Sequence, residues 1–241
     1  MALPKIELPI YDLKIPSTGK DIQIRPFKVK EEKLLLMAAE SNDPDEMINV
    51  TKQIVNNCIL TDKIDLEKLT FYDVDYIFIA LRAKSVGDKI EMKYVCNAVD
   101  DQGKTCNESF DAEFDISNVH IIEPVKDLKF DLGSNVIMKM KYPNYTIMKK
   151  ISDKDSNIDK KIKIIAASMD VVTQGNKVYT RKDFTEQEAI TFIENLTEIQ
   201  FKKLSDFVDD FPYFIVRLDK KCPKCGFEHT MEYNDLTDFF Q

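Results

Sequence analysis

Hydrophobic and polar positions in the first third of the chain alternate briefly and then follow the spacing of helices. Ile22 and Ile24 have the two-residue period of a strand, which Pro26 ends. The preceding residues 1–20 contain three prolines and isolated apolar residues, which favours an extended arm or an edge strand. Helix signals follow, with acidic residues or caps in each first turn. They predict helices from residue 29, over 43–59 and over 70–87.

The rest of the chain continues this mixture of strand and helix patterns. Two alternating runs, at 90–94 and 110–114, flank a polar loop with a glycine, as in a hairpin. Thr185 and Thr197 each begin a helix with a capping box, because Glu or Gln stands three residues later. Further strands are predicted near 130 and at 136–140, helices at 145–151 and 158–169, and a short hairpin at 174–179. The sequence therefore predicts an α+β fold.

Residues 220–233, KKCPKCGFEHTMEY, contain a motif typical of metal binding. Cys222 and Cys225 are separated by two residues and followed by Gly226, as in a zinc knuckle. Gly226 can adopt the positive φ that turns backbone amides toward the sulfurs. Apolar and polar residues alternate before and after the motif, so we expect it at the tip of a β-hairpin.

A second cysteine pair can complete a tetrahedral site. Cys96 ends the first alternating run and Cys106 begins the second, so these cysteines also belong to a hairpin tip. Two hairpin tips with two cysteines each match the four-thiolate site of a zinc ribbon. We therefore predict a structural Zn²⁺ ion, bound by Cys96, Cys106, Cys222 and Cys225.

Other interpretations of these cysteines are a redox dithiol, a disulfide or unrelated buried thiols. A redox CxxC motif normally opens a helix, whereas this one follows a predicted strand. A disulfide requires an oxidising compartment, and nothing in the sequence indicates one. Cys58 lies in a helical pattern and is interpreted as a small buried residue. His229 is the alternative fourth ligand, although a hairpin side chain that faces solvent is the simpler expectation.

The order of helix and cysteine hairpin recurs along the chain. Leu69 and Leu196, which precede two threonine caps, are 127 positions apart, and Cys96 and Cys222 are 126 apart. We interpret this as an internal duplication. It predicts two related helix-plus-hairpin half-units, 1–122 and 123–241, packed as one body and joined at the zinc site. Coincidence among common capping signals is the alternative.

Composition restricts the class of protein. The chain has 241 residues, with 42 acidic against 34 basic side chains and a net charge of -8, which disfavours general binding to nucleic acid. It contains no apolar run long enough for a membrane span and no leader pattern, so we expect a soluble protein made in a reducing cytoplasm. With two histidines and no phosphate loop, catalytic triad or open metal site, we expect neither enzymatic activity nor a small-molecule substrate.

Residues 24–38, IRPFKVKEEKLLLMA, resemble a block of the hub assembly proteins of the T4-type bacteriophage baseplate. The resemblance is most specific over this block, and the order of helices and cysteine hairpins agrees loosely elsewhere. It implies a structural subunit or an assembly chaperone of the tail baseplate hub, with no catalytic residues. The implied partners are other hub or tail proteins, in the host cytoplasm during assembly or in the virion.

Two terminal segments are candidates for docking onto such partners, because they carry exposed apolar or aromatic residues and adjacent phenylalanines are hard to bury in the chain's own core. The alternative is that they fit into a groove of the same domain. They are the N-terminal arm with Leu3, Ile6, Leu8, Ile10 and Tyr11, and the C-terminal residues 236–240 with Phe239 and Phe240. The alternative function is a nucleic-acid-binding regulatory protein of the zinc-ribbon type, since three lysines flank the CxxC motif. Those lysines equally offset the charge of a zinc tetrathiolate, about −2.

Overall fold

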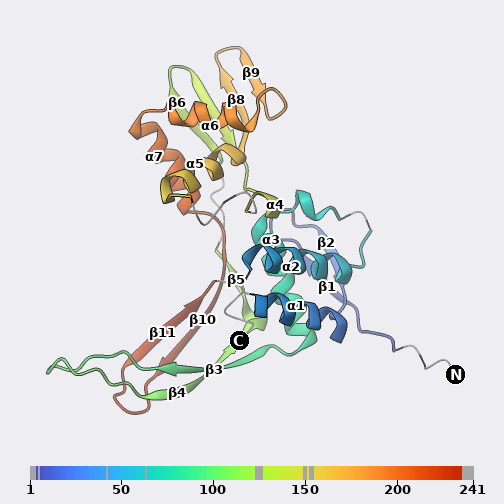
Figure 1. Cartoon of the computed structure of the whole chain (residues 1–241), viewed down its shortest axis with the longest axis vertical. Helices are drawn as coiled ribbons and strands as arrows, with labels where there is room; N and C mark the ends of the chain where they lie inside the picture. The colour runs from blue at the N-terminus through green and yellow to red at the C-terminus, as the bar shows by residue number, and fades with distance from the viewer. Residues whose placement is uncertain are drawn as a thin grey trace. The chain divides into compact units, whose positions relative to one another are not determined.

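The computed structural model describes residues 4, 6–41, 43–62, 64–122, 127–148, 151 and 155–234 of the chain. They form helices and small antiparallel sheets (Figure 1), so the predicted mixture of helix and sheet is confirmed. The chain folds into two compact units. Unit 1 comprises Met1–Ile64, Tyr72–Ile122 and Tyr213–Gln241, and unit 2 comprises Asp65–Phe71 and Glu123–Pro212.

Unit 1 begins with a short hairpin and three helices. Strand β1 (Tyr11–Lys14) pairs antiparallel with β2 (Asp21–Ile24), whose residues Ile22 and Ile24 are buried as their alternation predicts. The helices begin within a residue of their predicted starts. They are α1 (Val29–Ser41), α2 (Pro44–Cys58) and α3 (Phe71–Ser85).

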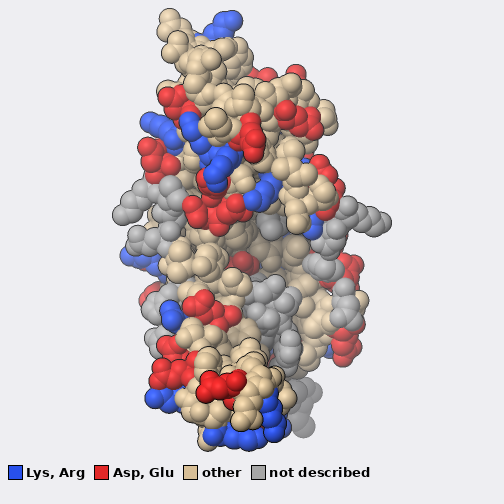
Figure 2. Space-filling model, turned by 90° about the vertical axis from the view of Figure 1, so that its left-hand side faces the viewer, with Lys and Arg blue, Asp and Glu red and all other residues tan. Residues whose placement is uncertain are grey.

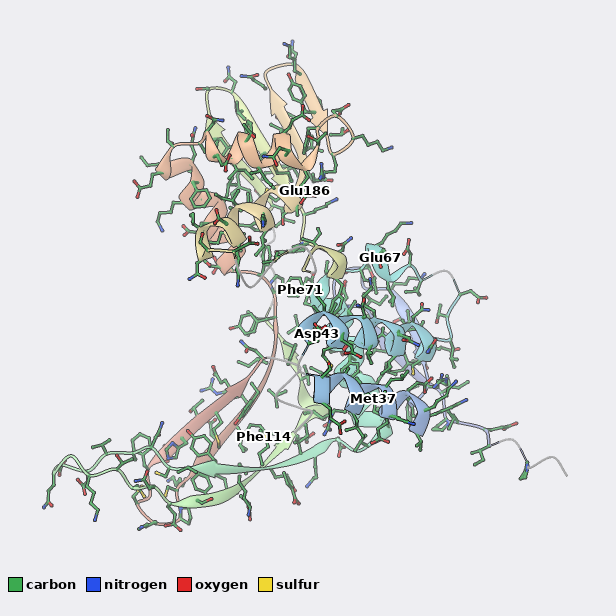
Figure 3. All side chains as sticks on the ribbon, in the orientation of Figure 1. Met37, Asp43, Glu67, Phe71, Phe114 and Glu186 are labelled. Carbon is green, nitrogen blue, oxygen red and sulfur yellow. The ribbon has the colours of Figure 1, made fainter. Side chains whose placement is uncertain are left out.

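Local signals account for where these helices begin and which faces they bury. Asp43, labelled in Figure 3, caps α2 by accepting a hydrogen bond from the Asp45 N–H at 2.9 Å. Helix α3 contributes the core face that its helical spacing predicts, and these side chains are buried. They are Val74, Ile77, Phe78 and Leu81.

A buried ion pair holds the end of β2 against α1. The Arg25 guanidinium binds both carboxylate oxygens of Glu31, at 2.8 and 3.1 Å, and also donates to the Asn57 carbonyl at 2.9 Å. Burial alone would raise the pKa of Glu31, but hydrogen bonds from Arg25 and from the Lys28 N–H lower it below its ordinary value. Arg25 and Glu31 both belong to the 24–38 block, so its unusual sequence has a structural role.

Cys58 provides a first testable prediction, on alkaline stability. It is fully buried, as expected, and burial raises the pKa of its thiol from 9.0 to about 11. The folded protein retains this proton more tightly than the unfolded chain, so the stabilising contribution is complete below pH 9 and is lost as the pH rises through 11. Between pH 8 and pH 11, the free energy of unfolding measured with urea is expected to fall by about 2 kcal/mol less in Cys58→Ala than in the wild type. Equal losses in the two proteins would refute this assignment.

Two further hairpins of unit 1 lie face to face. Strand β3 (Lys89–Val95) pairs with β4 (Ser109–Asp115), β10 (Phe214–Lys221) pairs with β11 (Glu228–Tyr233), and β5 (His120–Ile121) pairs with the start of β10. Both hairpins run side by side away from the helices (Figure 1). Figure 3 shows Phe114 between them, and its ring meets that of Tyr233 edge-on at 4.7 Å.

The inner faces of these hairpins share one hydrophobic cluster. Its buried members are Ile79, Ile90, Ala112, Phe114, Ile116, Phe214, Val216 and Met231. Residues from the early and late parts of the chain thus form a two-layer body whose charged side chains alternate outward. This packing brings the two cysteine-bearing tips to the same end.

Unit 2 is built on a four-stranded antiparallel sheet with helices packed against it. The strands, in spatial order, are β6 (Lys129–Gly133), β7 (Val136–Met140), β8 (Met169–Gln174) and β9 (Lys177–Thr180). Among the described residues its helices are α4 (Tyr145–Met148), α5 (Asn157–Ser168), α6 (Glu186–Glu194) and α7 (Glu198–Asp209), and it contains the 3₁₀ turn η1 (Leu66–Lys68). A second 3₁₀ turn, η2 (Ile116–Asn118), belongs to unit 1. The predicted capping boxes at Thr185 and Thr197 are both present.

The division of the chain bears on two predictions. The chain enters unit 2 at Asp65 and again at Glu123, and it returns to unit 1 at Tyr72 and again at Tyr213. The relationship between two half-units stays a prediction. In the N-terminal arm, Ile6 is 85% exposed and Ile10 57% exposed. Leu3 and residues 236–240 lie outside the described residues.

Candidate metal centre

The turn between β10 and β11 has the geometry of a knuckle. Lys221 and Glu228 form the last strand pair. Beyond them the Cys222 N–H donates to the Phe227 carbonyl at 2.9 Å, and the Gly226 N–H donates to the Cys222 carbonyl at 3.0 Å. Gly226 has a φ of 72°, the left-handed conformation that its sequence position predicts.

The turn between β3 and β4 is longer but holds its cysteines in a similar way. The Cys96 N–H donates to the Glu108 carbonyl at 2.8 Å, which continues the strand pairing to the first cysteine. The Cys106 N–H donates to the Ala98 carbonyl at 2.8 Å. Asn107 follows Cys106 with a φ of 54°, a conformation that Asn tolerates better than most side chains. Both turns therefore fix their cysteines through backbone hydrogen bonds.

The sulfur atoms of Cys96, Cys106, Cys222 and Cys225 all lie within 4.8 Å of one another. The Cys96 and Cys225 sulfurs are 3.6 Å apart, and those of Cys106 and Cys222 are 3.9 Å apart. A disulfide requires about 2.0 Å, so these cysteines are free thiols. Four sulfurs at about 2.3 Å from a tetrahedral zinc are separated by about 3.8 Å. The cluster can therefore hold a metal ion without rearrangement of the two turns.

The thiols of the cluster differ in acidity because their surroundings differ. Burial raises the pKa of Cys96 to about 12, although a hydrogen bond from the Ala98 N–H opposes this. Burial acts in the same direction on Cys222, but hydrogen bonds from the backbone N–H groups of Cys225 and Lys224 lower its pKa to about 7. The backbone donors thus favour the thiolate form of Cys222, whereas burial favours the protonated form of Cys96 in the absence of a metal ion.

His229 is not the solvent-facing side chain that the sequence favoured. It is 5% exposed, with its Nε2 atom 3.1 Å from the Cys96 sulfur. The ring lies on the inner face of β11 because it alternates with exposed Glu228 and Thr230 and shares its side with buried Met231. The alternation of β11 was the signal in the sequence that could have indicated the burial of His229. Aromatic residues that cover the ring, however, come from the distant β3–β4 hairpin.

An open hollow of about 470 Å³ lies beside the sulfur cluster, between the two turns. Val99 and Phe227 are 61% and 53% exposed at this end of the hairpins. Exposed lysines surround them, and Lys224 pairs with Glu108 at 3.3 Å. Figure 2 shows Lys and Arg side chains gathered at the lower end of the view, where the hairpins lie. The hairpin tips thus combine apolar and basic side chains.

A four-thiol cluster held between two hairpins is typical of structural metal sites, because it leaves no position open for a substrate. The fold and the cluster together define a protein of helices and small antiparallel sheets with a four-cysteine site that can hold a metal ion. A family model described as "T4 bacteriophage base plate protein" matches residues 8–241. The chain belongs to this family, which confirms the resemblance of the 24–38 block.

Membership of this family makes the chain a structural component of a bacteriophage tail baseplate, a setting in which it contacts other tail proteins of the virion. Searches among curated proteins and among solved structures each gave no significant match. Within the part of the chain that the structure describes, none of the helices combines the length and apolar character needed to cross a membrane.

Proposed function

We propose that the chain is a non-enzymatic component of the baseplate hub that acts, as a structural subunit or an assembly factor, by binding other hub or tail proteins. One observation carries the proposal: in a member of a baseplate family, thiols from two hairpins 126 residues apart converge within 4.8 Å. The bound ion is Zn²⁺, and its ligands are Cys96, Cys106, Cys222 and Cys225. Assembly takes place in the host cytoplasm before the protein enters the tail.

Zinc acts in this proposal as a clamp on the twin hairpins. The hydrophobic cluster holds the hairpins together along their inner faces, but the turns beyond it have many exposed side chains around the cysteines. A tetrahedral ion fixes both turns at one point and removes their freedom to separate. A rigid tip loses less conformational entropy when a partner binds it.

The order of elements supports two related half-units, 1–122 and 123–241, that meet at the metal. Helix α3 leads directly into the β3–β4 hairpin, and helix α7 leads into the β10–β11 hairpin. Each of these hairpins contributes two of the four sulfurs. A duplication explains why one ion takes an equal share of ligands from each half.

The exposed lysines beside the knuckle favour the second candidate, a nucleic-acid-binding regulatory protein of the zinc-ribbon type. The net charge of -8 works against it, because only a local patch is basic. Lys221 is moreover paired with Glu228 at 2.8 Å, and Lys224 with Glu108. Retention on a DNA column at physiological salt would favour this candidate, whereas we expect the protein to pass through.

Genetic complementation tests the proposed function. In a phage whose own copy of the gene is disabled, we expect the wild-type protein to restore complete baseplates. We expect the double variant Cys222→Ser, Cys225→Ser to reduce their yield at least tenfold, because the tips lose their clamp. The yield is measured by sedimentation of tail intermediates and by plaque counts.

Cys58→Ala is the matched control, because it removes a buried thiol outside the cluster and is expected to complement normally. Full complementation by the double variant would contradict a role for the metal in assembly.

Mass spectrometry of purified particles then distinguishes a subunit that is retained in the particle from an assembly factor that leaves it. Deletion of residues 1–10 tests the exposed arm and is expected to spare folding but weaken binding to partner proteins.

A further inference from the structure

The position of His229 gives the metal centre a fifth group whose role differs from that of the four cysteines. The imidazole is buried on the inner face of the β10–β11 hairpin, and its Nε2 atom lies 3.1 Å from the Cys96 sulfur. The four sulfurs already lie within 4.8 Å of one another without it. Because the four sulfurs already complete the set of metal ligands, the Nε2 atom of His229 can influence the metal only through the Cys96 sulfur that it contacts.

Aromatic rings fix the orientation of this imidazole. The ring centroids of Phe227 and Tyr94 lie 4.9 and 5.2 Å from that of His229, and the centroid of Phe110 lies 6.0 Å away. Tyr94 and Phe110 belong to the β3–β4 hairpin, whereas His229 belongs to β11. The imidazole therefore spans the two hairpins at the point where the metal joins them.

We propose that His229 is a positioning residue of the metal centre, whose Nε2–H donates a hydrogen bond to the Cys96 thiolate. The inference rests on the proposed metal site, because a bound metal ion displaces the proton of Cys96 and makes it a thiolate. A metal-bound thiolate can only accept, so Nε2 must carry the hydrogen. The hydrogen bond disperses negative charge from the Cys96 sulfur and orients this sulfur toward the ion. Residues that contact the ligands rather than the metal have the same role at other metal sites.

Cys96 is a ligand for which a further hydrogen-bond donor matters. Its side chain is fully buried, whereas Cys225 is exposed to water. Water can solvate the charge on an exposed sulfur, but a buried thiolate depends on protein donors. The Ala98 N–H is one donor to Cys96, and the His229 Nε2–H is the second.

Two substitutions in the full-length protein separate hydrogen bonding from packing. His229→Phe keeps an aromatic ring among its neighbours but loses the N–H, and His229→Gln keeps an N–H near the Nε2 position but loses the ring. We expect His229→Phe to lower the Zn²⁺ affinity about 10–100-fold, measured by competition with a chromophoric chelator. We expect His229→Gln to recover most of this loss, and Co²⁺-loaded His229→Phe to show a shifted sulfur-to-metal charge-transfer band. Phe227→Leu is the packing control and is expected to leave the band unchanged.

A measurement on the wild type makes the test independent of how the variants fold. With ¹¹³Cd²⁺ in the site and ¹⁵N-labelled histidine, nuclear magnetic resonance is expected to show an Nε2-protonated ring with weak coupling to the metal through the hydrogen bond. A deprotonated Nε2, or strong coupling from direct ligation, would overturn the inference. So would wild-type affinity in His229→Phe, or equal losses in the Phe and Gln variants.

The proposed metal site can fail separately from this inference. If the wild type binds one Zn²⁺ per chain and only the His229 results disagree, the positioning role is wrong and the clamp stands. If the wild type binds no Zn²⁺, both are wrong.

Discussion

Removal of zinc is expected to lower the free energy of unfolding of unit 1 by about 4 kcal/mol relative to protein held at free zinc near 1,000 times its Kd. The effect arises because only the folded tips assemble the four sulfurs, so the ion binds the folded state far better than the unfolded chain. The hydrophobic cluster between the hairpins remains, and we therefore expect loosened tips rather than a wholly unfolded chain.

Hydrogen exchange measures where this loss occurs. After chelation we expect faster exchange of backbone amides in the turns, including those of Cys96 and Cys222, and unchanged exchange in the β6–β9 sheet of unit 2. Cys222→Ser should reproduce the effect of the chelator, and Cys58→Ala should not. Identical exchange with and without zinc would contradict the clamp.

The same experiment has a defined dependence on pH. Each cysteine must lose its proton to bind the metal, so protons and zinc compete for the sulfurs. The pKa of about 12 for Cys96 in its buried setting makes this competition severe, whereas the pKa of about 7 for Cys222 makes it mild. Zinc-dependent stability is therefore expected to fall as the pH is lowered from 8 to 5, and a constant or rising contribution would be inconsistent with thiolate ligands.

Substitution of Glu31 is expected to have a comparable effect at the opposite end of unit 1. Glu31→Gln leaves the Arg25 guanidinium largely buried without a counter-charge, and loss of one partner of such a pair costs about 3–5 kcal/mol. The double variant Arg25→Met, Glu31→Met removes both charges and is expected to regain most of this stability. Urea unfolding monitored by circular dichroism measures each value.

The contribution of Glu31 also depends on pH in a definite direction. Its pKa in the folded protein lies below the ordinary value of 4.5, so its stabilising effect is present above that pH. The effect is lost as the pH falls through the folded-state pKa, and the difference between wild type and Glu31→Gln should narrow in acid.

The exposed pair of Lys89 and Glu113, at 2.7 Å, provides the matched control. Glu113→Gln is expected to cost less than about 1 kcal/mol, because solvent screens this pair. A loss in Glu113→Gln as large as that in Glu31→Gln would show that burial is not the cause of the difference.

Much of the fold was predictable because the signals that specify it act over a few residues. A threonine cap and its partner three positions later set the starts of α6 and α7, and both capping boxes formed as expected. Alternation in β2 and in the cysteine hairpins predicted which side chains are buried. Cysteine spacing predicted two tips with two thiols each, and the structure brings all four sulfurs together.

Other features depend on residues far apart in the chain, and short-range sequence patterns do not predict them. Asp73, in the first turn of α3, accepts hydrogen bonds from the backbone N–H and hydroxyl of Ser17, at 2.9 and 2.6 Å, across 56 positions of the chain. The chain returns to unit 1 at Tyr213, which no local boundary signal indicates.

Local sequence thus determined the elements, their caps and the pairing of cysteines within each turn, because these depend on neighbours along the chain. Tertiary packing decided that one turn meets the other and that the imidazole of His229 is buried at their junction. The rings of Tyr94 and Phe110 that cover this imidazole come from the other hairpin, so its burial exists only once the two hairpins have packed together.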